Sequence, residues 1–149
     1  MKNQPRQIPE PAIIDMHNNS ISLHKLVNKL QASLLSKATA RKSFIINDVD
    51  KSVSFSGKED MLAYVIGSLL IHAVYSSKES CIRIETASVE NQLQIRIRDN
   101  SKSAFVYSSY QHMLGTFMND AKKLGGNIGL EAKEKSGITV VFSFAKNAA

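Results

Sequence analysis

Few side chains in this sequence combine the type and the spacing that catalysis or metal binding requires. The one cysteine, Cys81, begins a predicted strand, where a small buried thiol is usual. No metal-ligand spacing links the four histidines, which are His17, His24, His72 and His112. No Gly-x-Ser-x-Gly nucleophile motif is present. Two candidates for chemistry remain: His72, whose neutral imidazole can ligate a metal, and Asp99, a carboxylate at a strand end.

Period-two alternation is the clearest structural signal, and it predicts the strand that ends at Asp99. Apolar and polar residues alternate over residues 82–85 and 93–98, on either side of a turn, which predicts an antiparallel hairpin. A second hairpin is expected over residues 128–130 and 138–144. Each hairpin should bury one face and leave the other in water. The outer face of the first hairpin carries either a basic patch or an ordinary solvated surface, made by Arg83, Arg96 and Arg98.

Helices must cover the buried face of this sheet, and the sequence shows helical periodicity in three segments. A first helix is expected over residues 23–42, and a third has its apolar stripe over 110–121. A second helix is opened by residues 57–60, has its apolar stripe over 61–74 and is ended by residues 76–80. Ser22 is a plausible N-cap for the first helix, and Gly125 should stop the third. Short strands are expected at 43–46 and 53–56, with a turn at 47–51 and a polar connection at 100–109. The order of elements predicts an α+β two-layer sandwich, in which three helices cover one face of a mixed, mostly antiparallel sheet.

Length and composition indicate a single globular domain. With 149 residues, 43% hydrophobic and 21% charged, the chain can bury one core and fits neither a disordered nor a membrane protein. Residues 1–18 hold all three prolines and no apolar signal core. They are expected to be a flexible lead-in to a cytoplasmic domain over residues 19–146. The net charge of +6 is spread along the chain without a basic run, which argues against a nucleic-acid partner.

Three segments resemble the ATP-binding catalytic domain of sensor histidine kinases, of the gyrase/histidine kinase/MutL (Bergerat-fold) superfamily. Residues 62–76, Leu-Ala-Tyr-Val-Ile-Gly-Ser-Leu-Leu-Ile-His-Ala-Val-Tyr-Ser, resemble the family's N-box helix. Residues 93–100, Leu-Gln-Ile-Arg-Ile-Arg-Asp-Asn, resemble the strand that enters the first glycine box. Residues 124–132 and 136–144 resemble the closing hairpin, with Gly-Gly followed by Gly-Ile-Thr-Val-Val-Phe. The resemblance covers residues 19–146 and implies the Bergerat fold.

The resemblance implies five candidate residues for binding ATP. Asp99 matches the carboxylate that accepts a hydrogen bond from the adenine amino group, and Asn100 follows it in the same motif. Thr139 matches a threonine near the same adenine edge. Ser68 and His72 match the two N-box asparagines, the second of which holds Mg²⁺, so that His72 is the one candidate metal ligand. Each has a structural alternative: His72 as a hydrogen-bonded core or rim histidine, Asp99 as a polar residue leaving a strand, Thr139 as an ordinary strand residue.

The sequence departs from the family at the phosphate cradle. Ser101 and Ser103 stand where the first glycine box has glycines, and the lid's closing glycine motif falls on residues 111–114, Gln-His-Met-Leu. Glycines there let backbone N–H groups approach the phosphates, and side chains obstruct that approach. The family's phosphoacceptor histidine lies on upstream helices, and only about twenty residues precede the domain.

These departures predict a degenerate histidine-kinase-like ATPase domain, a pseudokinase that is inactive or weak as an enzyme. It would act as a regulatory protein-binding module in two-component signalling. The expected partners are a response regulator, a histidine kinase or a second copy of the chain. The apolar stripe of the third helix is expected to be core, with part of it exposed as a docking surface: Tyr110, Met113, Phe117 and Met118. The alternative is an active ATP- and Mg²⁺-binding domain of a sensor histidine kinase or anti-sigma-type protein kinase.

Overall fold

The computed structural model describes residues 20–76, 78–100, 104–133 and 137–145. Its helices are α1 (Leu23–Ala40), α2 (Glu59–Ser76) and α3 (Ala104–Lys123). The main sheet has five strands: β2 (Phe44–Asp48), β4 (Cys81–Val89), β5 (Gln92–Asp99), β6 (Gly126–Lys133) and β7 (Gly137–Ala145). Two short strands, β1 (Ser20–Ser22) and β3 (Ser54–Ser56), pair antiparallel beside it.

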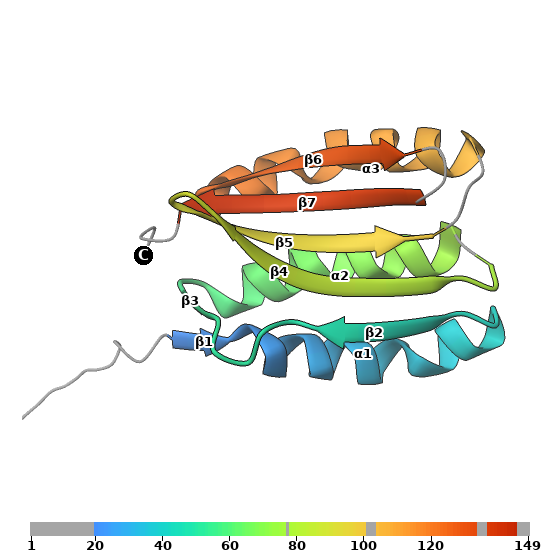
Figure 1. Ribbon diagram of the computed structural model, residues 1–149, viewed down its shortest axis with the longest axis horizontal. Coiled ribbons are helices and arrows are strands. Elements are labelled where there is room, and N and C mark those ends of the chain that lie inside the picture. The colour runs from blue at the N-terminus through green and yellow to red at the C-terminus, as the bar shows by residue number, and fades with distance from the viewer. Residues whose placement is uncertain (1–19, 77, 101–103, 134–136, 146–149) are drawn as a thin grey trace, which may run out of the picture.

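All three helices cover one face of the five-stranded sheet, which runs in the order β2-β4-β5-β7-β6 (Figure 1). The β2–β4 pair is parallel, and the other three pairs are antiparallel. The predicted α+β two-layer sandwich with a mixed, mostly antiparallel sheet is therefore confirmed. In Figure 1, α2 lies behind the centre of the sheet, with α1 behind one edge and α3 behind the other.

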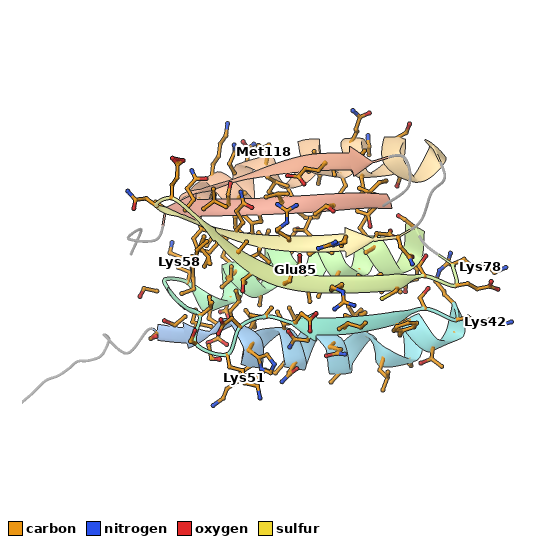
Figure 2. All side chains as sticks on the ribbon, in the orientation of Figure 1. Lys42, Lys51, Lys58, Lys78, Glu85 and Met118 are labelled. Atoms are coloured by element: carbon orange, nitrogen blue, oxygen red, sulfur yellow. The ribbon has the colours of Figure 1, made fainter. Side chains whose placement is uncertain are left out.

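The two predicted hairpins form the centre and one edge of the sheet. In β5 and β7, every second residue is buried beneath the helices. The opposite face is polar, and each of its three arginines pairs with a carboxylate: Arg83 with Asp48, Arg96 with Glu131 at 2.6 Å, and Arg98 with Glu85 at 2.5 Å. Figure 2 shows Glu85 on this helix-free face. The three arginines therefore belong to an ion-paired, solvated sheet face.

Helix α2 is the centre of the core, as its broad apolar stripe predicted. Its buried side chains include Leu62, Ile66, Leu69 and Leu70, none of which is accessible to solvent. Burying an aliphatic side chain of this size stabilises a fold by roughly 1.5–3 kcal/mol. Helix α2 runs behind the centre of the sheet along the direction of its strands (Figure 1). Its position therefore determines where the side chains on its outer face lie.

The predicted helix ends are confirmed at α1 and at the end of α3. The Ser22 hydroxyl accepts a hydrogen bond from the backbone N–H of Lys25 (3.4 Å), as an N-cap does. Gly125, just beyond α3, has φ of 78°, a left-handed conformation that glycine adopts without strain.

Three features differ from the sequence-based expectation. Strand β1, three residues long, was not expected. Strand β2 extends through Asp48, into the predicted turn. Helix α3 begins at Ala104, so the predicted connection is wrong for residues 104–109, which are helical. Four residues separate β5 from α3. The predicted lead-in, residues 1–18, lies outside the described residues.

Candidate functional site

Asp99 is the last residue of β5, and its side chain lies on the helix-covered face of the sheet. The alternation of β5 buries Leu93, Ile95 and Ile97, and the same alternation carries the Asp99 carboxylate into the interior. Only 1% of Asp99 is exposed. A buried carboxylate is costly unless hydrogen bonds satisfy it, so its partners determine what the site can do.

Tyr110 of α3 supplies such a partner. Its hydroxyl donates a hydrogen bond of 2.8 Å to Oδ2 of Asp99, and the side chain is fully buried. Burial raises the pKa of Tyr110 far above its ordinary value, and the charge of Asp99 and the hydrogen bond raise it further. The phenol therefore keeps its proton at all physiological pH values and acts as a donor.

His72 of α2 lies on the other side of Tyr110. The two rings meet edge to face, with their centroids 4.6 Å apart. The Nε2 atom of His72 is 3.0 Å from the hydroxyl oxygen of Ser109, the neighbour of Tyr110 on α3. Burial lowers the pKa of His72, and the charge of Asp99 opposes this shift without reversing it. The four residues Asp99, Tyr110, His72 and Ser109 form a polar cluster between α2, α3 and the end of β5, here called the Asp99 cluster.

The structure brings some of the predicted site residues together and separates others. Ser68 is partly buried one helical turn before His72, on the same side of α2. Asn100 is exposed, and its side-chain oxygen accepts a hydrogen bond from the backbone N–H of Cys81 at 3.1 Å, which closes the end of the β4–β5 pair.

Thr139 lies on the opposite face of the sheet from the Asp99 cluster. The β5–β7 register pairs Thr139 with Arg98, while Asp99 pairs with Ile138. Paired residues share a face of the sheet, and Arg98 is on the solvated face. Thr139 is therefore not brought together with Asp99, and the residue of β7 beside Asp99 is the buried Ile138.

Contacts within the chain occupy atoms at two of the positions that the resemblance assigns to ATP and Mg²⁺. Oδ2 of Asp99, the carboxylate matched to the adenine contact, accepts the Tyr110 hydroxyl in a fully buried contact. The His72 nitrogen that could meet a metal is bonded to Ser109. In the described part of the chain, no group of three or more His, Cys, Asp or Glu residues is placed to hold a metal ion.

Sequence reasoning missed Tyr110 and Ser109 as members of the site. Tyr110 was assigned to the apolar stripe of the third helix, and it is indeed buried. A tyrosine in a core stripe needs a buried partner for its hydroxyl, and an aspartate ending a core-facing strand is a suitable acceptor. The sequence could therefore have predicted that the Tyr110 hydroxyl pairs with the Asp99 carboxylate. Ser109 carried no signal of its own.

Comparison with known proteins identifies the fold through structure alone. No family model and no curated protein matches the sequence. The Acinetobacter baumannii histidine kinase AdeS superposes with a TM-score of 0.73 at 14% identity, over 86% of this chain and 66% of that one. The catalytic domain of histidine kinase ThkA gives 0.67 at 14% identity, over 85% of this chain and 95% of that domain. ThkA in complex with the response regulator TrrA gives 0.66 at 12% identity, over 87% of this chain.

The chain therefore has the fold of a histidine-kinase catalytic ATPase domain, as the sequence resemblance implied. It spans just under two thirds of the AdeS chain and 42% of the ThkA chain in the complex, so it is similar to only part of those kinases. Among the described helices, none combines the length and the apolar character that crossing a bilayer needs.

Proposed function

We propose that this chain is a histidine-kinase-like ATPase domain that has lost nucleotide binding and acts as a regulatory protein-binding module. The observation that carries the proposal is the contact between Tyr110 and Asp99. In the family, this carboxylate receives the adenine amino group. Here a protein side chain is buried against it, with its hydroxyl 2.8 Å away.

The short link between β5 and α3 supports the same proposal. Four residues join Asp99 to the first residue of α3, where the family has a long lid with glycine-rich ends. Helix α3 extends toward the N-terminus through Ser109 and Tyr110, so that these two side chains reach α2 and β5. A triphosphate needs several charge-assisted hydrogen bonds and a metal. That no group of three or more His, Cys, Asp or Glu residues gathers in the described part of the chain is consistent with the proposal.

As partners of such a module we propose signalling proteins: a response regulator, a histidine kinase or a second copy of the chain. The ThkA neighbour is a histidine kinase in complex with a response regulator, and that partner class is the first to test. We propose a cytoplasmic location on the same grounds. Nucleic acid is not proposed as a partner, because each arginine on the sheet face is paired with a carboxylate.

Isothermal titration calorimetry with ATP and Mg²⁺ tests the proposal directly. We expect a dissociation constant weaker than about 1 mM, together with an unchanged melting temperature at millimolar nucleotide. The structural neighbour ShkA, a full-length protein solved in complex with AMPPNP, is the positive control when measured in parallel. Micromolar binding that is lost in Asp99→Asn would instead establish the alternative, an active ATP-binding domain.

A further inference from the structure

A groove runs between α2 and α3 on the outer side of the helix layer, away from the sheet. One face of α3 lines it at helical spacing, with Ser109, Met113, Phe117 and Asp120 among the lining residues. Contacts of α2 with α3 pair His72 with Ser109 and Tyr64 with Phe117, so the two helices are antiparallel. The groove comprises two separate hollows of about 580 and 510 Å³. Tyr64 lines the first and Phe117 lines the second, and the centroids of their rings are 5.8 Å apart.

Beside this α2–α3 groove, α2 exposes an apolar stripe, of which Tyr64 lines a hollow of the groove. Tyr64, Ile71 and Tyr75 follow one another at spacings of seven and four, which places them on one face of the helix. Their exposed fractions are 56%, 42% and 52%. Large apolar side chains gathered in a stripe, rather than scattered singly, mark interaction surfaces.

One end of the groove is acidic, although the chain as a whole carries a charge of +6. Glu59, Asp60 and Asp120 line the hollow at the start of α2, with Lys58 as the basic residue among its six lining residues. Within the described residues, these three carboxylates have no ion pair. Glu85 and Glu131 on the sheet face, in contrast, are each paired with an arginine. Figure 2 shows Lys58, before α2, and Lys78, after it, at opposite ends of the molecule, so the acidic hollow lies at one extreme of the groove.

We propose that the α2–α3 groove docks an amphipathic helix of a partner protein, with basic residues at the end that lies over Glu59, Asp60 and Asp120. Two antiparallel helices, with the exposed apolar stripe of α2 beside the two hollows, offer a surface on which a third helix can lie by ridge-into-groove packing. From Glu59 to His72 this surface is about 20 Å long, the length of a helix of about 13 residues. The apolar face of the partner helix contacts Tyr64 and Ile71, and its Lys or Arg residues neutralise the acidic end. The inference rests on the proposed protein-binding function and names the surface and the chemistry of the partner.

The probe is a synthetic peptide of about 15 residues, with leucines at helical spacing and three lysines at its C-terminal end, where they favour the helix dipole. A matched peptide carries three glutamates in place of the lysines. We expect the lysine peptide to shift amide resonances of the ¹⁵N-labelled full chain along α2 and α3, and to bind at least tenfold more tightly than the glutamate peptide. Equal affinity for both peptides, or shifts confined to the sheet face or α1, would overturn the proposal.

Matched variants test which surface binds the peptide. Ile71→Glu should weaken binding by roughly tenfold or more, because a buried charge replaces an apolar contact. Leu35→Glu changes a residue of α1 that is 63% exposed, against 42% for Ile71, and that lies outside the groove, and should leave binding unchanged. Asp120→Lys should weaken the lysine peptide and strengthen the glutamate peptide, a reversal that misfolding would not produce. Equal losses in Ile71→Glu and Leu35→Glu would contradict the proposed groove.

Two further measurements separate this inference from its alternatives. Sedimentation equilibrium of the full chain should show a monomer, and a dimer abolished by Ile71→Glu would make a second copy the occupant and overturn the proposed partner. Calorimetry with ATP and Mg²⁺ on the same samples separates the two proposals. If the peptide binds and ATP also binds with micromolar affinity, only the proposed loss of nucleotide binding is refuted. If neither the peptide nor ATP binds, only the proposed docking groove is refuted.

Discussion

The contact between Tyr110 and Asp99 combines two groups that are each unfavourable to bury alone. A carboxylate taken out of water loses strong hydration, and a buried phenol hydroxyl without an acceptor loses the hydrogen bond that it would make to water. Joined at 2.8 Å, they satisfy each other and tie α3 to the end of β5. The same contact occupies Oδ2 of the carboxylate, and the proposed loss of nucleotide binding is argued from this contact.

The first prediction concerns the Tyr110 hydroxyl. Tyr110→Phe leaves the buried Asp99 carboxylate without this donor, and should lower the free energy of unfolding by about 1–3 kcal/mol. Urea denaturation followed by circular dichroism measures the change. Tyr75→Phe, which removes a hydroxyl from a tyrosine that is 52% exposed, is the matched control and should stay within about 0.5 kcal/mol. Similar losses in the two variants would mean that the contact with Asp99 contributes nothing specific.

The second prediction concerns the protonation of His72. Its pKa is lowered in the folded chain by burial, so the unfolded chain binds more protons as pH falls through the ordinary histidine value of about 6.5. The stability that neutral His72 contributes is present above that pH and is lost as pH falls through the lower folded pKa. The loss of unfolding free energy between pH 7 and pH 5 should therefore be smaller in His72→Gln than in the unsubstituted chain.

His112→Gln is the control for this pH dependence, because His112 is an exposed histidine of the same groove. Subtracting the two stability curves cancels the contribution of carboxylates, which titrate at lower pH. If His72→Gln and His112→Gln give parallel curves from pH 5 to pH 7, the burial of His72 does not couple to folding.

At the scale of elements, sequence periodicity predicted most of the fold but not the position of α3 relative to the site. Alternation found the two hairpins, and the wide apolar stripe found α2, because each signal is local. The start of α3 was missed, and the contacts that hold this part of the helix join it to other elements, to α2 through Ser109 and to β5 through Tyr110. Local propensity cannot report such contacts.

Thr139 illustrates a conflict between two kinds of sequence evidence. The resemblance assigned it to the ATP site, while the alternation of Ile138, Val140, Phe142 and Phe144 as core residues requires Thr139 to face the other way. The register of β5 and β7 agrees with the alternation. Face assignments from periodicity rest on backbone geometry, whereas motif matches at low similarity carry over a position without its surroundings.

The third prediction concerns the start of β7, which must pass close to the end of β5. Gly137 has φ of 81°, and a Cβ there would lie 2.1 Å from the backbone oxygen of Asp99. Gly137→Ala should therefore lower the free energy of unfolding by roughly 2 kcal/mol or more, since neither backbone nor conformation can adapt. Gly129→Ala in β6 is the control, because a Cβ there meets nothing within 4 Å. It should be neutral or stabilising by up to about 1 kcal/mol, and thermal unfolding of the two variants side by side decides the comparison.

The molecule as a whole divides its surface between two faces of different character. The sheet face is polar, and its arginines are paired with carboxylates within the chain. The helix face carries the exposed apolar stripe of α2 and the acidic end of the groove, whose carboxylates form no ion pair with other described residues. A face whose charges are already satisfied has little to offer a partner, so interaction is expected on the helix face.

The last prediction concerns where the folded unit begins. The first core side chain in the described residues is Ile21, 8% exposed, and Ser22 caps α1. If the domain starts at residue 19, a chain without residues 1–18 should keep its free energy of unfolding within about 0.5 kcal/mol. A chain without residues 1–22 loses the burial of Ile21, the cap and the β1–β3 pair, and should be less stable by about 2 kcal/mol or more. Urea denaturation of the two truncated chains beside the full chain measures both effects, and a loss in the shorter truncation equal to that in the longer one would place the start of the domain before residue 19.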